Sequence, residues 1–370
     1  MTTYFSAKEL LRAPTERAAF SDRQAYVCAE LSRLAYFKFE GGFEIDQVLE
    51  LARGFVREDD RFQALEKQLR HLLSRSPDAS KEAKTVLSEI LEAAEFRLVE
   101  TFSERGTQAF ICTKAIDIGS STTKTVAFVV FRGTEPTDFR DIRTDVRASL
   151  ATLTVGQRVM EVHSGYLAAF GHVRQGIEAT LRSTAYDQLF LTGHSLGGAL
   201  AALATRVLAA DDTGACYTFG APPVGTQSVQ DGLKTPTYHI INEVDIVPRL
   251  PNPWTASGIL FLFRLFRLLA KSVTWLEKML LDGTWDERLE AFVQAMTQYR
   301  HPGYVSYLVG RGQDAQLRYN VSSFDRFRWW TSMMWKQRLF QFGRMVSDHA
   351  IDAYVDKLTA HAAKRQEPSA

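Results

Sequence analysis

The sequence predicts an α/β fold, with a central, mostly parallel sheet flanked by helices. Two observations predict it. Helical and strand patterns alternate between residues 165 and 242, and this alternation is typical of the crossover connections that join parallel strands. Before them come three β-rich runs, FRLVETF, AFICTKAI and TVAFVVF, separated by clusters of Gly, Ser and Thr. These runs predict an antiparallel lead-in to the sheet.

Residues 1–95 are expected to form a helical layer before the sheet. Apolar residues recur at helix-face spacing from Asp22 to about Glu95, which is typical of helices that pack on a core. A partner-binding face is the alternative interpretation of this layer. The first twenty residues lack the uninterrupted apolar core of a secretory signal, so we expect a cytoplasmic protein, with signal-less secretion left open.

Residues 96–360 are expected to form one sheet-containing domain, followed by a polar tail over residues 361–370. A helical insertion is expected over residues 251–300, where the alternation of strands and helices stops. The predicted elements of the domain are, in order, a helix over 165–181, a strand over 188–193, a helix over 196–210, strands over 215–220 and 237–242, a strand pair over 303–310 and 316–321, and a final helix from about 351.

The composition and the motif content exclude several classes of function. Lys plus Arg (44) nearly balances Asp plus Glu (43), so no overall charge would recruit nucleic acid. The chain lacks the H-E-x-x-H motif of metal hydrolases and the G-x-x-x-x-G-K-S/T motif of nucleotide-binding proteins. Its three cysteines, Cys28, Cys112 and Cys216, show no C-x-x-C spacing, which indicates buried thiols and not a metal or redox site.

The segment Gly193-His194-Ser195-Leu196-Gly197 lies between an apolar strand and an Ala-rich helix. This is the context that a nucleophile elbow, G-x-S-x-G, requires in an α/β-hydrolase fold. The turn would place Ser195 at the N-terminus of the helix, where free N–H groups favour a developing negative charge. A glycine-rich turn that only allows close packing is the alternative. Because a Ser hydroxyl is a poor nucleophile without a base, the elbow predicts a His and an acid further along the chain.

Asp245 is the predicted acid. It follows the strand TYHIIN, at the carboxyl end where open α/β sheets build their sites. In α/β hydrolases the acid comes after the serine and before the histidine, and Asp245 fits that order. The alternative interpretation is an ordinary loop carboxylate.

His349 is the predicted base. Four histidines follow the elbow. Three fit poorly: His239 lies inside the strand before the acid, His301 has a position typical of a structural hydrogen bond, and His361 lies in the polar tail. His349 lies where a loop enters the last helix, which suits a side chain that carries protons. A histidine on the helix surface is the alternative.

Seven segments, in family order, resemble the class 3, or fungal-type, lipases. They are FRGTE (131–135), VHSGY (162–166), GHSLGG (193–198), YTFGAPPVG (217–225), INEVDIVPRLP (241–251), HPGYVSYL (301–308) and SDHAIDAY (347–354). Three features depart from the family pattern. Pro223 stands where the family usually has Arg, the disulfides of secreted members cannot form in their usual number, and 104 residues separate the acid from the base.

This resemblance implies hydrolysis of acylglycerol esters through a Ser-His-Asp triad and an acyl-enzyme, with no metal or organic cofactor. It implies Thr134 and Leu196 as oxyanion donors and a lid from Thr137 to about Leu150. It also leads us to expect a substrate cleft lined by Phe139, His194, Pro222 and Val247. Two other functions stay open: a phospholipase A, which the same triad would serve, and a non-catalytic lipase-like protein that binds partners.

Residues 254–281 form an apolar-basic stretch within the insertion. Charges interrupt it too often for a membrane span, which needs ~20 mostly apolar residues. In a helix, Arg264, Arg267 and Lys271 would share one face and leave aromatic and aliphatic side chains on the rest. This pattern indicates peripheral contact with a lipid–water interface, and a helical cap packed on the sheet is the alternative. The sequence leaves the oligomeric state open.

Overall fold

The structure is a computed structural model of the chain. It describes residues 4–11, 19–37, 78–117, 123–133, 150–209, 211, 214–243, 245, 247–249, 298–301, 303–310, 312–319, 321–322, 325, 328–329 and 349–365. Three expected features lie largely outside these residues: the middle of the N-terminal layer (38–77), the lid expected from Thr137 to about Leu150, and the helical insertion expected over 251–300.

Eight of the described strands form one sheet, in the order β1-β2-β3-β6-β7-β8-β9-β10. Their bounds are β1 Arg97–Glu104, β2 Thr107–Asp117, β3 Thr123–Phe131, β6 Gln188–His194, β7 Cys216–Phe219, β8 Thr237–Asn242, β9 Tyr304–Val309 and β10 Gln316–Tyr319. Strands β3, β6, β7, β8 and β9 pair in parallel. The predicted antiparallel lead-in is confirmed, because β1 pairs antiparallel with β2 and β2 with β3.

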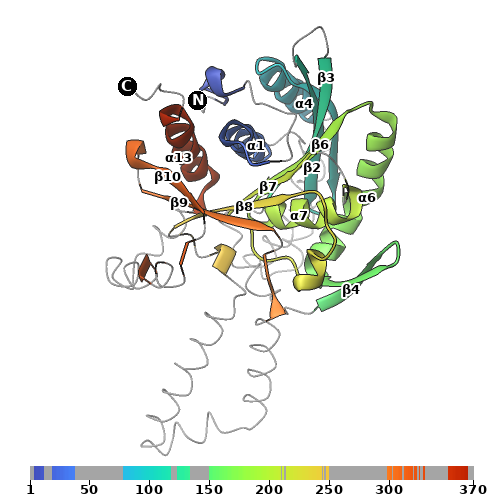
Figure 1. The fold of residues 1–370 in the computed structure, drawn as a ribbon. Coiled ribbons are helices and arrows are strands. Elements are labelled where there is room, and N and C mark those ends of the chain that lie inside the picture. The colour runs from blue at the N-terminus through green and yellow to red at the C-terminus, as the bar shows by residue number, and fades with distance from the viewer. Residues whose placement is uncertain are drawn as a thin grey trace, which may run out of the picture.

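Helices cover both faces of this sheet, as Figure 1 shows. Their bounds are α1 Asp22–Leu34, α4 Asp78–Glu92, α6 Ser164–Ser183, α7 Leu196–Leu208 and α13 Ile351–Lys364. Short 3-10 helices add η1 Lys8–Leu11, η3 Gln227–Val229, η4 Val247–Arg249 and η5 Gly312–Asp314. A mostly parallel sheet with helices on both faces and a strand–Ser–helix turn at its centre is the α/β-hydrolase arrangement that the sequence predicts.

Alternate residues of the central strands build a separate core on each face. In β3, Phe128 and Val130 belong to the cluster that contains α1, α4 and α13, whereas Val129 and Phe131 belong to the cluster that contains α6 and α7. Successive strand side chains point to opposite faces, so a strand buried on both faces must be apolar throughout. Burial of each such large side chain contributes about 1.5–3 kcal/mol, so both cores stabilise the sheet whose central strands lead to the predicted site.

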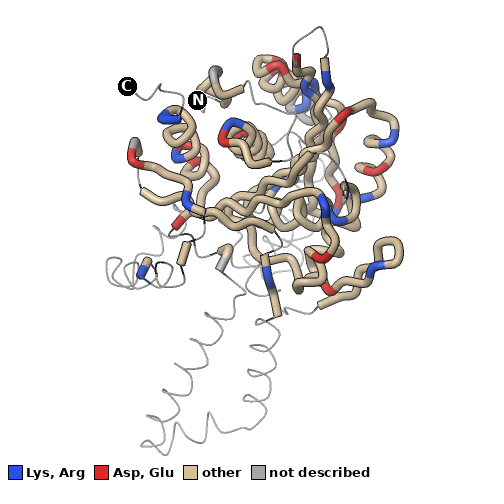
Figure 2. Tube along the Cα trace, in the orientation of Figure 1, with Lys and Arg blue, Asp and Glu red and all other residues tan. Residues whose placement is uncertain are grey.

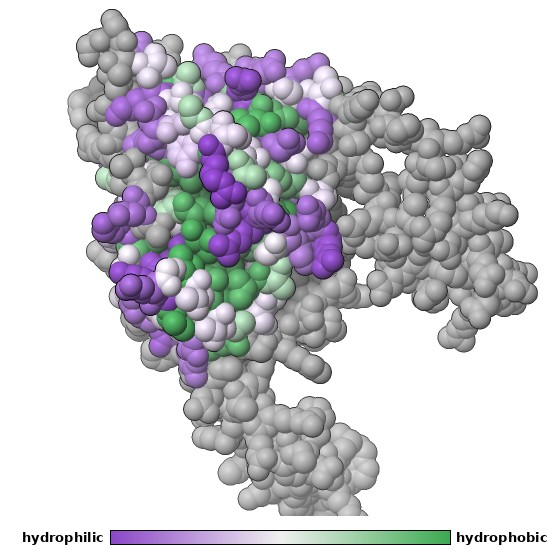
Figure 3. All heavy atoms as spheres, turned by 90° about the vertical axis from the view of Figure 1, so that its right-hand side faces the viewer, coloured by the Kyte–Doolittle hydropathy of each residue, from purple (hydrophilic) through white to green (hydrophobic). Residues whose placement is uncertain are grey.

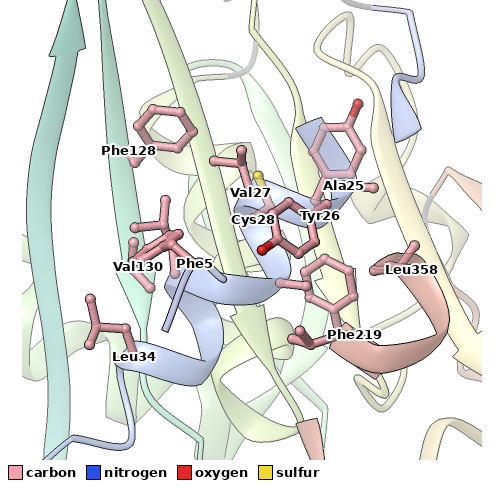
Figure 4. Packing of buried hydrophobic residues seen from close by; sticks show 14 of the residues in the cluster. Phe5, Ala25, Tyr26, Val27, Cys28, Leu34, Phe128, Val130, Phe219 and Leu358 are labelled. Carbon is pink, nitrogen blue, oxygen red and sulfur yellow. The ribbon is translucent and has the colours of Figure 1, made fainter. Parts of the chain in front are cut away.

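Helix α1, from the N-terminal layer, is part of the main core. It begins at Ser21, whose hydroxyl accepts a hydrogen bond from Gln24 N, as expected of an N-cap. In Figure 4 its side chains lie between Phe128 of β3 on one side and Phe219 and Leu358 on the other. Because it is enclosed by the sheet and α13, α1 is buried on most of its surface. The helix therefore belongs to the body that carries the site.

A two-stranded antiparallel sheet, β4 (Leu150–Val155) with β5 (Arg158–His163), is an element that the sequence analysis did not predict. Its turn contains Gly156 at a φ of 59°, a conformation that favours glycine. The alternation in LATLTV and RVMEVH around this glycine is the signal that would have revealed the hairpin. At the C-terminal end, α13 continues to Lys364, so the first four residues of the expected polar tail are helical.

The described surface carries no large field of one charge. Figure 2 shows Lys and Arg interspersed with Asp and Glu over the outer elements, and on the face turned to the viewer in Figure 3 hydrophilic residues are mixed with apolar ones. None of the described helices is both long enough and apolar enough to cross a membrane. The three cysteines are free and buried, as expected.

Candidate active site

Ser195 lies at the turn between β6 and α7, in the strained conformation that an elbow requires. Its φ of 56° and ψ of −127° fall outside the regions that L-residues normally adopt. Two hydrogen bonds hold this turn: Ser195 N donates to Phe219 O of β7 at 2.9 Å, and Gly198 N donates to Ser195 O at 3.0 Å. The turn therefore directs the Ser195 side chain away from the strand, at the N-terminus of α7.

The glycines of the elbow leave no room for side chains. A Cβ built on Gly193 would overlap the carbonyl of Gly197, and a Cβ built on Gly197 would overlap the carbonyl oxygen of Phe131 in β3. Since β3 pairs with β6 in parallel, the helix can start this close to the sheet only if both positions lack a side chain. The G-x-S-x-G pattern is thus a steric requirement of the fold at this point.

His349 lies against the nucleophile, immediately before α13. Its Nε2 is 2.9 Å from Ser195 Oγ, although the two residues are 154 positions apart in sequence. Both are almost completely buried, with 2% and 1% of their surfaces exposed. The predicted meeting of serine and histidine is therefore present in the structure.

Asp245 completes a hydrogen-bonded line. Its Oδ2 is 2.7 Å from His349 Nδ1, and because an ionised carboxylate only accepts, the ring proton lies on Nδ1. The lone pair of Nε2 then faces Ser195, whose hydroxyl donates to it. This is the proton arrangement that a serine nucleophile needs for activation.

The carboxylate of Asp245 is itself held by two further donors. Val247 N donates to Oδ1 at 2.9 Å, and the hydroxyl of Tyr354, on α13, donates to Oδ2 at 2.5 Å. The same Tyr354 hydroxyl accepts from Asn242 N at 3.0 Å. The carboxylate is fully buried, so these donors replace the water that an exposed carboxylate would bind.

Gly220, directly after β7, lies against both Asp245 and His349. Its φ is +59°, and a Cβ there would lie 2.8 Å from Asp245 Oδ2 and 3.1 Å from His349 Cε1. A side chain would displace the acid, the base or both. The glycine is therefore required both for its backbone conformation and for the space it leaves.

His194 differs from the expectation that it lines the substrate cleft. Its side chain is buried, with 3% exposed, and points into the protein. Its Nδ1 is 2.8 Å from the hydroxyl of Tyr36, and its Nε2 is 2.6 Å from the main-chain oxygen of His349. Burial lowers the pKa of His194 well below its usual range, with a smaller contribution from His349. The lowered pKa makes His194 neutral. Both of its ring nitrogens have protein partners, so the side chain is bonded inside the protein.

The other predicted site residues fall into two groups. Leu196 is the first residue of α7, where a backbone N–H has no acceptor within the helix, and Pro222 is buried in the loop after β7. Thr134 and Phe139 lie outside the described residues. The chain enters that segment beside the nucleophile, since a Cβ on Gly133 would lie 3.3 Å from Ser195 Cβ.

Three residues of the site were missed by the sequence analysis: Tyr354, Gly220 and Tyr36. Tyr354 carried a detectable signal, because it falls on the apolar face of the last helix, where a hydroxyl needs a buried partner. His194, which bonds to the Tyr36 hydroxyl, lies 158 residues away, and no local pattern reveals this pair. No group of three His, Cys, Asp or Glu that could hold a metal ion occurs in the part of the chain that the structure describes.

Comparison with known proteins shows where the similarity lies. Residues 128–254 match the family model described as "Lipase (class 3)". A secreted mono- and diacylglycerol lipase of Fusarium solani is 33% identical over 121 residues, which are 29% of this chain and 36% of that protein. A lipase of Rhizomucor miehei is 35% identical over 106 residues, 25% of this chain and 29% of that protein.

A more distant relative is the toxin TseL of Vibrio cholerae, which is 26% identical over 160 residues. These residues make up 42% of this chain and 23% of TseL. The matched part of the chain thus spans less than two fifths of the length of any of these three relatives. The similarity includes the elbow and the acid, since both fall within residues 128–254.

Proposed function

Because residues 128–254 match the class 3 lipase family model, we propose that the protein is a serine carboxylic-ester hydrolase that acts on acylglycerols. The observation that supports this most directly is the buried line from Ser195 Oγ through His349 to Asp245, with distances of 2.9 and 2.7 Å. In that line each member has the donor or acceptor that the next one needs.

In the proposed reaction, Ser195 Oγ attacks the ester carbonyl while His349 Nε2 takes its proton. The resulting imidazolium is stabilised by Asp245, and its proton then passes to the departing alcohol. Water repeats the sequence on the acyl-enzyme and releases the fatty acid. Because all three side chains are buried, these charges interact in a medium of low polarity, where such stabilisation is stronger than in water.

The negative charge that forms on the carbonyl oxygen needs donors on the side away from His349. We propose the N–H of Leu196 as one, because it is free of the helix pattern at the start of α7. Thr134 is proposed as the second donor. Its support is its position one residue after Gly133, which borders Ser195.

Acylglycerols are proposed as substrates because of the match to the class 3 lipase family model and because the Fusarium solani relative is a mono- and diacylglycerol lipase. A panel of p-nitrophenyl esters, mono-, di- and triacylglycerols and phospholipids would test this with the wild type and Ser195→Ala. We expect hydrolysis of acylglycerols and soluble esters, and a loss of at least about 10⁴-fold in Ser195→Ala.

Ser183→Ala is the matched control, because Ser183 is exposed at the end of α6. This variant should hydrolyse every ester at the wild-type rate. Faster hydrolysis of phospholipids than of acylglycerols would replace the proposal by phospholipase A. An inactive wild type that also fails to react with a serine-directed phosphonate would make the chain a lipase-like binding protein.

We further propose that residues 254–281 make peripheral contact with the lipid–water interface. The support is the sequence pattern of three cations on one helical face, since the stretch lies outside the described residues. Replacing Phe263 and Phe266 with Ser should lower activity on emulsified lipid several-fold more than activity on a soluble short-chain ester. Equal losses on both substrates would refute this contact.

A further inference from the structure

Helix α1 contacts both the strand that carries the nucleophile and the helix that follows the base. Its Ser32 Oγ is 2.9 Å from Thr192 Oγ1 of β6, and its Arg33 forms an ion pair with Asp352 of α13, with 3.3 Å between Nη1 and Oδ1. Tyr36, two residues after the end of α1, reaches the residue that precedes the nucleophile. Helix α1 and Tyr36 therefore contact the segments that lead to Ser195 and follow His349.

Tyr36, His194 and the main chain of His349 form a hydrogen-bonded series. His194 Nε2 is 2.6 Å from the His349 oxygen, and since a carbonyl oxygen only accepts, Nε2 carries the proton. In a neutral ring the other nitrogen, Nδ1, has a free lone pair. The Tyr36 hydroxyl, at 2.8 Å, therefore donates to it. The series runs in one direction, from Tyr36 through the ring to His349.

The charge on His194 matters because of its distance from the proposed base. The two ring centroids are 4.6 Å apart, and His349 becomes positive during the proposed acylation step. A second positive ring at that distance would oppose this charge. Burial, followed by the proximity of His349, lowers the pKa of His194, so the ring is neutral at pH 7. Donation by Tyr36 to Nδ1 favours the same neutral form.

Tyr36 also borders the chain that leads to the proposed oxyanion donor. A Cβ built on Gly133 would overlap the Tyr36 hydroxyl and would lie 2.5 Å from the main-chain oxygen of His194. The guanidinium of Arg132 lies 5.9 Å from the centre of the Tyr36 ring. One side chain of the N-terminal layer thus packs against the exit of β3 and against His194.

We propose that Tyr36 is a positioning residue for the ester hydrolysis proposed above. It holds His194 in the neutral form with the proton on Nε2. Through His194 it fixes the main chain of His349, and with it the imidazole, relative to Ser195. The inference rests on the proposed function, because the position of this ring affects a rate only if Ser195 reacts.

Tyr36→Phe tests the proposal, because it removes the hydroxyl and keeps the ring. With a soluble p-nitrophenyl ester we expect kcat to fall about tenfold, the rate equivalent of one buried hydrogen bond, with KM changed less than about twofold. Titration with a p-nitrophenyl phosphonate should release as much p-nitrophenol per protein as in the wild type, at the slower rate. An unchanged amount with a lower rate indicates sites that are all folded but less well aligned.

Tyr217→Phe is the matched control. Tyr217 is a buried tyrosine of β7 whose hydroxyl accepts a hydrogen bond from Ser21 N, the N-cap of α1. Loss of the Tyr217 hydroxyl weakens the attachment of α1 and leaves the contacts of His194 unchanged, so kcat should stay at the wild-type value. An equal fall in kcat in both variants, or a reduced number of reactive sites with an unchanged rate in Tyr36→Phe, would overturn the proposal in favour of a purely structural role.

A double variant gives a second, independent measurement. Because Tyr36 acts through His194 in this proposal, adding Tyr36→Phe to His194→Phe should cause no further fall in kcat, whereas additive losses would overturn it. The same assays separate a failure of the proposed function from a failure of the role of Tyr36. A wild type that hydrolyses no ester and releases no p-nitrophenol refutes the proposed function, whereas an active wild type with an equally fast Tyr36→Phe refutes only the role of Tyr36.

Discussion

The nucleophile elbow and the acid–base arm are held in place by different physical means. The elbow, residues 193–198, depends on backbone: a positive φ at Ser195 and glycines whose side-chain space is occupied by neighbouring carbonyl groups. The acid–base arm, formed by Asp245, His349 and Tyr354, depends on side-chain hydrogen bonds between segments 104 and 109 residues apart. Damage to the elbow should therefore appear mainly as lost stability, and damage to the arm as a lower rate.

The greatest loss of activity should come from a change in the acid–base arm. Asp245→Asn keeps the size of the side chain but removes the charge that opposes the imidazolium and sets the ring tautomer. We expect kcat on a soluble ester to fall about 10⁴-fold, with the midpoint of thermal unfolding near that of the wild type. Asp211→Asn, in an exposed ion pair with Lys234, should change neither quantity. A fall in kcat of less than tenfold would remove the role of acid from Asp245.

The next effect is on the elbow. Gly197→Ala introduces a Cβ that would overlap the Phe131 carbonyl oxygen, so the free energy of unfolding should fall by about 3 kcal/mol. Urea denaturation would measure it. Gly171→Ala is the control, because this glycine is exposed within α6 and a Cβ there meets nothing within 4 Å; it should stabilise by up to about 1 kcal/mol. Equal stability of the two variants would contradict the view that position 197 has no room for a side chain.

Tyr354→Phe removes one donor from the arm without changing any charge. Asp245 keeps Val247 N and His349, so we expect kcat to fall about tenfold and stability by roughly 1 kcal/mol. Tyr26→Phe is the matched control. Tyr26 is buried in α1 and its hydroxyl bonds to Ala7 N and Glu30, so its loss should lower stability to a similar extent and leave kcat unchanged. Equal kcat in the two variants would contradict a role for Tyr354 in holding the acid.

Stability near the arm should also depend on pH, through His301. His301 Nε2 donates to Pro248 O, three residues after Asp245, and burial lowers the pKa of His301 to about 4. In the unfolded chain a histidine titrates near 6.5, so between about 6.5 and 4 the unfolded state binds the additional proton. Stability should be full above pH ~6.5 and should fall by on the order of 1 kcal/mol per pH unit per buried histidine below it.

His301→Gln isolates this contribution from that of the carboxylates. Urea unfolding between pH 7.5 and 4.5 should show a shallower fall in stability for the variant than for the wild type. Identical slopes would mean that His301 is protonated equally in the folded and unfolded chains. A wild-type stability that rises as the pH falls would contradict the sign of the effect.

Much of the fold and the three members of the proposed triad were predictable, and the reasons differ between regions. The elbow was predictable because Ser195 and its glycines are neighbours in the chain, and the strand and helix around them have distinct periodicities. Asp245 and His349 were predictable because they follow a strand and precede a helix in the order that the fold requires. The hairpin β4–β5 was missed although its alternation was readable. The burial of His194 was missed because a G-x-S-x-G pattern does not tell which way the residue before the serine points.

From the sequence alone came the order of strands and helices along the chain and the strained turn at Ser195, because periodicity and the steric limits of a short turn act between neighbouring residues. The two proposed partners of Ser195 came from their order in the chain after the elbow. Only the tertiary structure decided which residues surround that serine and its partners. Gly220 lies against the acid, the hydroxyl of Tyr354 donates to the acid, and the hydroxyl of Tyr36 bonds to His194. These contacts arise when α1 and α13 pack on the same face of the sheet, and packing between segments hundreds of residues apart depends on the shape of the whole core.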